Sequence, residues 1–370
     1  MVLIHEFGHM VMAKRAGVRV EEFGVGYPPK ILSLFKDKSG TEYSLNLLPF
    51  GGFVRLLGEE GEESGLKKTG KEFYTKSKKE RLMIIMAGAV MNFLFGVVAF
   101  GAIYTKIGIP EAIGAVEVIG VAKNSPAETA GITVGDKVTG VYGDDFSEKT
   151  TDFITFAQAT SKHAGEEVWI SFERETAKYD TPVYVRKVDE IPEEEGAIGV
   201  TMKDTEFIFY PIWQRPFRGM WIGLQQAIVF GMFLVGALGT MLRDLFVSGV
   251  VPAEVAGPVG IGHAVIRNQL LTRDLISVKN INFAAVLSIN LAIINMFPFP
   301  ALDGGRVVFV LLEGVMRRRV KPVIERWANM AGFGLLLLLI VTVTFNDLKT
   351  ILVEAGLVER VVDFVGILKK

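Results

Sequence analysis

Four long stretches without a charged residue constrain this chain more than any other feature of its sequence. They cover residues 82–105, 219–242, 281–302 and 327–346. The hydrocarbon core of a bilayer is about 30 Å thick, so a helix that spans it needs about 20 mostly apolar residues. Half of the 370 residues are hydrophobic and the mean hydropathy is +0.36, which is more apolar than a soluble globular chain. The sequence therefore predicts a polytopic α-helical membrane protein.

The composition excludes several classes of function. The formal net charge is −1 with a pI near 6.5, so nothing indicates a nucleic-acid partner. The chain has no cysteine, which excludes disulfides, a thiolate nucleophile and a metal site with cysteine ligands. It has only four histidines, so few residues could form a histidine-based metal site.

Clusters of basic residues predict the orientation in the membrane. Seven Lys or Arg residues lie between 67 and 81, before the first apolar stretch, and five lie between 317 and 326, before the last. Short loops rich in Lys and Arg stay in the cytoplasm. Residues 106–215 instead carry more acidic than basic residues. We therefore expect a multi-pass protein of the cell (inner) membrane with this acidic region outside the cytoplasm.

The acidic region has the pattern of a soluble α+β insert. Residues 167–172 alternate between polar and apolar, as in a half-buried strand. Residues 125–136 contain SPA, AGI and GD in an order that resembles the signature of bacterial PDZ domains, which bind extended peptides at a sheet edge. The sequence Gly196, Ala197, Ile198 and Gly199 resembles their peptide-binding loop. The alternative is an ordinary β-rich domain.

The sequence HExxH at residues 5–9 carries the clearest chemistry. On a helix, His5 and His9 lie on one face, so both imidazoles can reach one metal ion. Glu6 can then act as a general base on a water molecule at that metal. Ionisable residues are costly in an apolar segment and are functional by default. We expect a zinc site here, with three protein ligands and one open position.

Asp303 is the best candidate for the third ligand. It ends the apolar stretch 281–302, just after Pro298 and Pro300. Prolines break a helix, and irregular backbone at membrane depth is tolerated only beside protein or a water-filled cavity. A broken helix that presents a carboxylate suits a buried metal site. The alternative is that Asp303 only ends the span at the membrane interface.

Taken together, these motifs resemble the site-2 protease family of intramembrane zinc metalloproteases, most closely its bacterial RseP type. The matching segments are HExxH at 5–9, NxxPxPxLDGG at 295–305, the PDZ-like phrase at 125–136, the GPxG phrase at 257–260, and 87–93, which is similar to AGPxxNF with Ala89 in place of proline. Residues 49–54 also match the membrane-associated hairpin of that family.

The resemblance implies a zinc metalloendopeptidase that hydrolyses peptide bonds in transmembrane segments, in regulated intramembrane proteolysis. It implies that His5, His9 and Asp303 bind Zn²⁺ and that Glu6 is the general base. The expected partners are single-span membrane proteins and the lipid bilayer. The residues expected to hold substrate are Asn295, Pro298, Gly51, Gly52 and Phe53. Residues 43–48 and 53–56 are predicted to pair as this hairpin, whose outer edge would bind an extended substrate.

Four regions are expected along the chain. They are a first catalytic membrane half at 1–105, the PDZ-like domain at 106–205, an interfacial amphipathic helix and loop at 206–280, and a second catalytic membrane half at 281–370. Only four residues precede His5, so we expect that the first helix as given cannot cross the membrane fully, through either a truncated N-terminus or a gene start assigned too late. A non-catalytic membrane scaffold that uses the PDZ-like domain is the main alternative function, and a transporter is a third. The sequence gives no indication of the oligomeric state.

The metal site also restricts how residues 219–242 can lie. With the insert outside, residues 281–302 must run inward so that Asp303 reaches the cytoplasmic side together with His5 and His9. This is possible only if residues 219–242 do not cross the membrane. We expect them to form an interfacial or re-entrant helix, and Trp213 and Trp221 suit an interface. The alternative is a fifth span.

Overall fold

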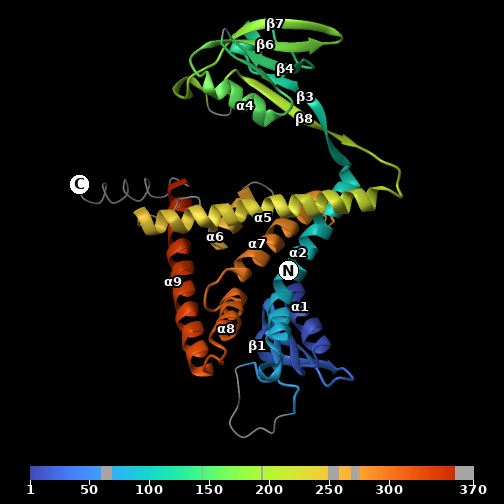
Figure 1. Ribbon diagram of the computed structural model, residues 1–370, viewed down its shortest axis with the longest axis vertical. Helices are drawn as coiled ribbons and strands as arrows, with labels where there is room; N and C mark the ends of the chain where they lie inside the picture. The colour runs from blue at the N-terminus through green and yellow to red at the C-terminus, as the bar shows by residue number, and fades with distance from the viewer. Residues whose placement is uncertain are drawn as a thin grey trace, which may run out of the picture. The chain divides into compact units, whose positions relative to one another are not determined.

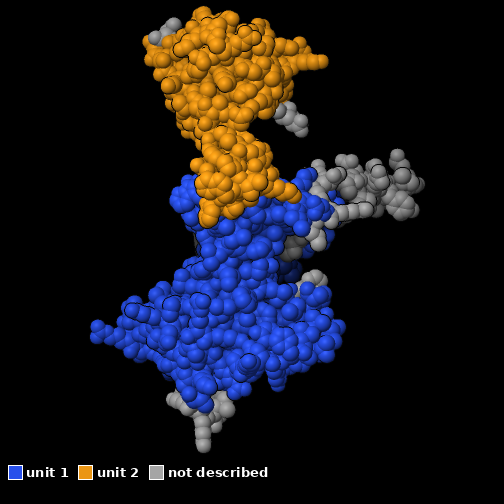
Figure 2. Space-filling model, turned by 90° about the vertical axis from the view of Figure 1, so that its right-hand side faces the viewer, with its two compact units in different colours: residues 1–103, 219–370 blue, residues 104–218 orange. Residues whose placement is uncertain are grey.

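The computed structural model describes residues 1–59, 69–143, 145–192, 195–248, 258–267, 274 and 276–354. Of the GPxG phrase, Gly257 lies outside these residues. The chain divides into two compact units, one formed by Met1–Ile103 with Gly219–Lys370 and the other by Tyr104–Arg218. Figure 2 shows the two units in different colours. The insert predicted at 106–205 falls within the second unit.

The first unit is built from helices and one small sheet (Figure 1). Its helices are α1 (Val2–Arg15), α2 (Lys78–Ile107), α5 (Arg215–Ser248), α6 (Pro258–Arg267), α7 (Val278–Met296), α8 (Asp303–Met316) and α9 (Pro322–Glu354). Its strands are β1 (Val20–Lys36) and β2 (Glu42–Leu56). Among the described residues, α2, α5, α7 and α9 are long and apolar enough to cross a membrane. The expected class of a polytopic α-helical membrane protein is consistent with these four helices.

The helix α7 ends earlier than the apolar stretch that predicted it. The stretch extends to residue 302, but the helix ends at Met296, and Phe297 already has an extended backbone. Pro298 and Pro300 cannot continue a helix because each lacks an N–H donor. A new helix, α8, begins at Asp303. The prediction of a broken helix that presents a carboxylate is confirmed.

Helices α1, α2 and α7 pack closely through small residues. A side chain at Gly8 of α1 would lie 2.9 Å from the carbonyl carbon of Ala87 in α2. On another face of α2, the Ser288 hydroxyl of α7 donates to the carbonyl oxygen of Asn92 at 2.9 Å. A side chain at Gly96 would lie 2.5 Å from Ile289. The helix α2 is therefore the common support for α1, which carries HExxH, and for α7.

The helix α5 is one continuous helix of 34 residues. Figure 1 shows α5 running across α2 and α7 rather than along them. It contacts α2 where Gly223 meets Gly101, and it contacts α7 where Gly231 meets Ile293. An interfacial position for α5 stays a prediction.

The strand pairing differs from the predicted hairpin. Residues 43–48 and 53–56 do not pair with each other. Instead, Phe23 of β1 pairs with Val54 on one side and with Tyr43 on the other, and Gly24 pairs with Phe53 and Ser44. The first part of β1 therefore lies between the two segments. The turn-rich residues 49–52 predicted a tight hairpin, but both strands are long and bend back, so each contributes two segments to the sheet.

The second unit is an α+β domain, as expected. Its antiparallel sheet has the order β7-β6-β4-β3-β8, with β5 paired to β4. Alternate residues of β6, such as Val168, Ile170 and Phe172, point into the core, as the sequence alternation predicted. The strands are β3 (Ile109–Val121), β4 (Lys137–Tyr142), β5 (Ser147–Lys149), β6 (Glu167–Arg174), β7 (Ala177–Tyr184) and β8 (Val200–Ile208), and the helices are α3 (Pro126–Thr129) and α4 (Phe153–Lys162).

An ion pair inside this domain gives a first prediction. Asp136 is fully buried and accepts hydrogen bonds from Arg174 Nε at 2.7 Å and from the Thr133 amide at 2.8 Å. Burial opposes ionisation, but the bonds from Arg174 and Thr133 outweigh it and hold the pKa of the Asp136 carboxyl below its ordinary value. Asp136→Asn is expected to lower the free energy of unfolding of this unit by about 2 kcal/mol, because it leaves Arg174 without its anion.

The loss is measured by hydrogen exchange of residues 104–218 in the whole protein. Because the folded pKa is depressed, the contribution of Asp136 is fully present above the unfolded pKa, about 3.9, and falls as the pH drops below it. The difference between wild type and Asp136→Asn is therefore largest at neutral pH. Asp180→Asn, at an exposed position, is the control. Equal protection in all three proteins at neutral pH would show that the ion pair adds no stability.

Candidate metal centre

His5 and His9 lie one turn apart on α1, and both are buried, with exposed fractions of 6% and 8%. Their Nε2 atoms are 3.1 Å apart, as the i, i+4 spacing predicted. The residue that makes room for both rings is Gly88 of α2. A side chain there would lie 2.6 Å from Cε1 of His5 and would overlap Nε2 of His9. A glycine is therefore required opposite the two histidines.

The break between α7 and α8 brings Asp303 to the two histidines. Its Oδ2 lies 2.9 Å from Nε2 of His5 and 3.2 Å from Nε2 of His9. The position depends on Gly304 and Gly305, because a side chain at Gly304 would lie 2.5 Å from the carbonyl carbon of Met296 and one at Gly305 would lie 2.8 Å from that of Phe299. The first turn of α8 thus packs directly against the irregular segment 297–302, and residues nearly 300 positions apart form one cluster.

This cluster fits a zinc ion. Ligands about 2.0–2.2 Å from a tetrahedral zinc lie about 3.3 Å from one another, and the three atoms here are 2.9–3.2 Å apart. Nδ1 of His9 lies 2.8 Å from the carbonyl oxygen of Ile84, which can only accept, so Nδ1 carries the proton. In the neutral ring, the Nε2 lone pair then faces the cluster. Two imidazole nitrogens and one carboxylate oxygen leave a fourth position open, as in catalytic zinc sites.

Glu6 lies beside the cluster and contacts the sheet. Glu6, His5, His9 and Asp303 line the same cavity of about 150 Å³. Glu6 Oε2 accepts a hydrogen bond from the backbone N–H of Val54 in β2 at 3.1 Å. The carboxylate is therefore held next to the three candidate ligands by an edge of the sheet, which is the arrangement that a general base requires.

The other predicted site residues lie in different places. Asn295 is near the cluster, because its amide nitrogen is 3.5 Å from Nε2 of His5. Pro298 does not line the metal cavity but lines an apolar groove beside it. Gly51 and Gly52 pack against Val2 and Leu3 at the start of α1. Phe53 pairs with Gly24 in the sheet. The predicted peptide-binding loop, residues 196–199, lies in the second unit.

In the loop Gly196–Ala197–Ile198–Gly199, the backbone already has partners. The carbonyl oxygens of Ala197, Ile198 and Gly199 accept hydrogen bonds from the amides of Arg186, Ala127 and Ala122. The Ile198 side chain is buried in the domain core. Peptide binding by this loop stays a prediction.

Sequence reasoning missed three residues or pairs that shape the site. Gly88 is the first. The second is Arg306, one turn after Asp303, which forms an ion pair with Glu59 and lines the metal cavity. The third is a buried ion pair between α2 and α8, in which Arg81 Nη1 lies 2.7 Å from Glu313 Oε2. The sequence does show that Arg306 lies three positions after Asp303, on the same side of a helix. Nothing in the sequence indicated that its partner is Glu59.

Gly88→Ala gives a second prediction. The added methyl group would occupy the space of the two imidazole rings, so the rings must move apart. Groups that orient metal ligands typically contribute 10–100-fold to metal affinity, and we expect a loss of that order together with lower activity. Zinc affinity is measured by competition with a chelator. Gly334→Ala, where an added methyl group meets open space, is the control. Unchanged zinc affinity in Gly88→Ala would contradict the predicted overlap.

The sequence is similar to that of a known protein family over most of its length. The model for peptidase family M50 matches residues 1–339. The zinc metalloprotease RasP of Shouchella clausii is 30% identical over 94% of this chain and 96% of its own length. RasP of Geobacillus kaustophilus is 28% identical over 94% and 95%. Among solved structures, the PDZ domain of the SdrC-like protein from Listeria monocytogenes matches 25% of this chain and 90% of its own, with 18% identity and a TM-score of 0.20. The chain belongs to peptidase family M50 and is a zinc metalloprotease.

Proposed function

We propose that this site hydrolyses peptide bonds within the transmembrane segments of single-span membrane proteins, in regulated intramembrane proteolysis. The observation that carries the proposal is the meeting of His5, His9 and Asp303 beside Glu6 in a unit with four apolar helices. The three residues would bind zinc, and Glu6 would be the general base. When bound, the zinc ion supplies a Lewis acid that polarises the scissile carbonyl and acidifies water. A non-catalytic scaffold would need no base beside these ligands.

The chain's own residues would handle the proton and the substrate. Glu6 would take the proton of the attacking water and deliver it to the leaving amine. The Val54 N–H keeps the Glu6 carboxylate in place for this transfer. The amide of Asn295, close to His5, would donate to a carbonyl of a substrate that reaches the metal centre.

The sheet edge at residues 52–56 would bind the substrate in extended form. Among the described strands, these residues pair with β1 alone, and the N–H of Val54 points away from β1 toward Glu6. A peptide bond inside a helix is shielded, so the substrate must be unwound before hydrolysis. An edge strand replaces the lost helical hydrogen bonds with its own backbone groups. Gly51, Gly52 and Phe53 would form the start of this edge.

Val54→Pro gives a third prediction. Proline removes the N–H that donates to Glu6, and it disturbs the strand edge that is proposed to pair with the substrate. We expect cleavage to fall by about tenfold or more, from the loss of one charge-assisted hydrogen bond of about 1.5–3 kcal/mol, while the zinc content stays the same. Val54→Ala retains the N–H and serves as the control. Normal cleavage by the proline variant, with zinc bound, would remove the sheet edge from the mechanism.

A second cavity offers a route for water. This polar cavity of about 620 Å³ shares Glu59, Asp303 and Arg306 with the metal cavity, and it extends to Arg326 at the start of α9. The basic residues nearby are predicted to be cytoplasmic. We infer that water enters through this cavity, past the Glu59–Arg306 ion pair, and that the active site opens toward the cytoplasmic side.

The orientation can be tested directly because the chain has no cysteine. A single cysteine at an exposed position such as Lys321 should react with an impermeant thiol reagent only from the cytoplasmic side. A cysteine at Glu167 in the PDZ-like domain should react only from the opposite side. Labelling of both from one side would contradict the proposed extracytoplasmic position of the domain.

Cleavage of a panel of single-span proteins by the purified enzyme in liposomes tests the function itself. We expect new chain ends inside the apolar segment of at least one substrate, identified by mass spectrometry. Substrates with helix-breaking residues near the cut should be cleaved faster than stable helices. Cuts confined to the soluble parts of every substrate would show a membrane-bound protease that does not act within the bilayer.

A further inference from the structure

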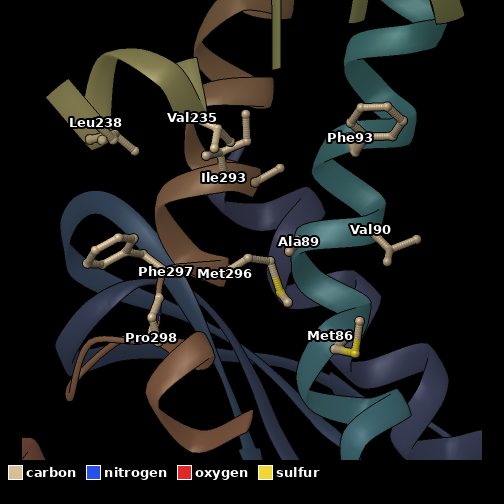
Figure 3. A pocket seen from close by; sticks show the side chains of 12 residues that line it. Met86, Ala89, Val90, Phe93, Val235, Leu238, Ile293, Met296, Phe297 and Pro298 are labelled. Carbon is tan, nitrogen blue, oxygen red and sulfur yellow. The ribbon is translucent and has the colours of Figure 1, made fainter. Parts of the chain in front are cut away.

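An apolar groove of about 560 Å³ lies beside the metal centre, between α2, α5 and the end of α7 (Figure 3). Every residue that lines it is apolar. The α2 wall includes Met86 and Val90, and the α5 wall includes Val235 and Leu238. Pro298, just beyond the end of α7, also lines it. The mechanism described above uses none of the side chains from α2 and α5, whereas Pro298 is among the residues that the family resemblance implies hold substrate.

The groove and the metal cavity share no lining residue, but residues that are adjacent in the chain lie at the two sites. Ala89 of α2 lines the groove, and the preceding residue, Gly88, lies against the rings of His5 and His9. On the other side, Met296 of α7 lines the groove, and the preceding residue, Asn295, lies 3.5 Å from His5. A chain that leaves the groove therefore reaches the proposed zinc ligands within a few residues.

The chemistry of the groove restricts what can occupy it. An extended peptide exposes backbone N–H and C=O groups, and burying such groups without partners costs several kcal/mol each in an apolar site. The groove offers no polar side chain to satisfy them. A helix satisfies its own backbone and presents only side chains. A helix is about 10 Å across and rises about 5.4 Å per turn, so the groove has room for one face of a short helical stretch.

We propose that this groove receives one face of the substrate's transmembrane helix, next to the point where the helix unwinds toward the metal centre. The helical part would rest on α2 and α5, and the unwound part would pair with the sheet edge at residues 52–56. The proposal rests on the proposed function. It adds a position for the part of the substrate that remains helical, and it gives α5 a role in binding.

Two glycines of α5 provide a matched test. A side chain at Gly239 or at Gly236 would meet no other atom within 4 Å, so leucine can be accommodated at either position. Only Gly239 lines the groove. Gly239→Leu should raise the KM for a single-span substrate by about tenfold, in line with steric discrimination in apolar pockets, and should leave kcat and zinc content near wild type. Gly236→Leu should behave like wild type.

Crosslinking locates the substrate independently, because the chain has no cysteine of its own. Val235→Cys and Phe233→Cys place a thiol two positions apart on α5, at side chains that are 59% and 67% exposed. Only Val235 lines the groove. In liposomes, with Glu6→Gln present to prevent cleavage, a substrate with one cysteine in its span should form a disulfide with position 235 and not with position 233.

These two experiments distinguish failure of the groove proposal from failure of the proposed proteolytic function. One result would show that the proposal is wrong and that the groove holds lipid chains. In that result, wild type cleaves the substrate, Gly239→Leu cleaves it with an unchanged KM, and position 235 gives no more crosslink than position 233. If wild type cleaves no single-span protein although it contains zinc, the proposed function fails first. A raised KM only in Gly239→Leu, with crosslinking only at position 235, supports the proposal.

Discussion

Glu6→Gln is expected to retain zinc and to lose proteolysis. The glutamine amide has nearly the same shape and can still accept the hydrogen bond from Val54, so the fold and the three candidate ligands stay in place. It cannot accept a proton from water, and general acid–base catalysis typically contributes about 10²–10⁴-fold to the rate. We expect a loss of that size in the cleavage rate of a single-span substrate in liposomes, at an unchanged zinc content.

The matched control for this variant is Glu206→Gln, at an exposed carboxylate of the other unit. It removes one negative charge without touching the metal cavity and should cleave like wild type. Proteolysis well above background in Glu6→Gln would show that another group accepts the proton. Loss of zinc in Glu6→Gln would instead make Glu6 a ligand or a structural residue.

Asp303→Ala is expected to have the second large effect, because, within the described part of the chain, it removes the one carboxylate that forms ion pairs with both histidines. Even groups that only orient metal ligands contribute 10–100-fold to affinity, so the loss of a ligand should weaken zinc binding by about 100-fold or more. Activity should be lost with the metal. The measurement is zinc retention against a graded series of chelator concentrations, followed by cleavage of the substrate.

The alternative role of Asp303, at the membrane interface without a metal, predicts a different result. If the carboxylate only begins α8 at the membrane interface, Asp303→Ala should bind zinc as tightly as wild type. Asp180→Ala, at an exposed position in the second unit, controls for the loss of one acidic residue. Full zinc affinity in Asp303→Ala would leave His5 and His9 with another, still unassigned, third ligand.

The parts of the site that follow from local physics could be predicted from the sequence. His5 and His9 are four residues apart on one helix, so their meeting needed only the helical repeat. The break before Asp303 followed from Pro298 and Pro300, which cannot continue α7. In both cases a short segment determines its own geometry, whatever it packs against.

The parts that depend on distant contacts could not be predicted. Gly88 looked like any small residue in an apolar helix, and its importance appears only when the imidazole rings of α1 lie against it. Arg306 and Glu59 are 247 positions apart and meet only in the folded unit. Turn residues alone indicated a hairpin at 49–52, but the first part of β1 lies between the two predicted strands. Strand partners are chosen by packing across the whole sheet rather than by the turn.

X-ray absorption at the zinc edge of the purified wild-type protein tests the central claim most directly. We expect about one zinc per chain, bound to nitrogen and oxygen at about 2.0–2.2 Å, with the scattering pattern of two imidazoles. In His9→Ala the two-imidazole pattern should be lost. A zinc site with the same two-imidazole pattern in His9→Ala, or a wild-type protein that binds no zinc, would contradict the claim that His5, His9 and Asp303 form the metal centre.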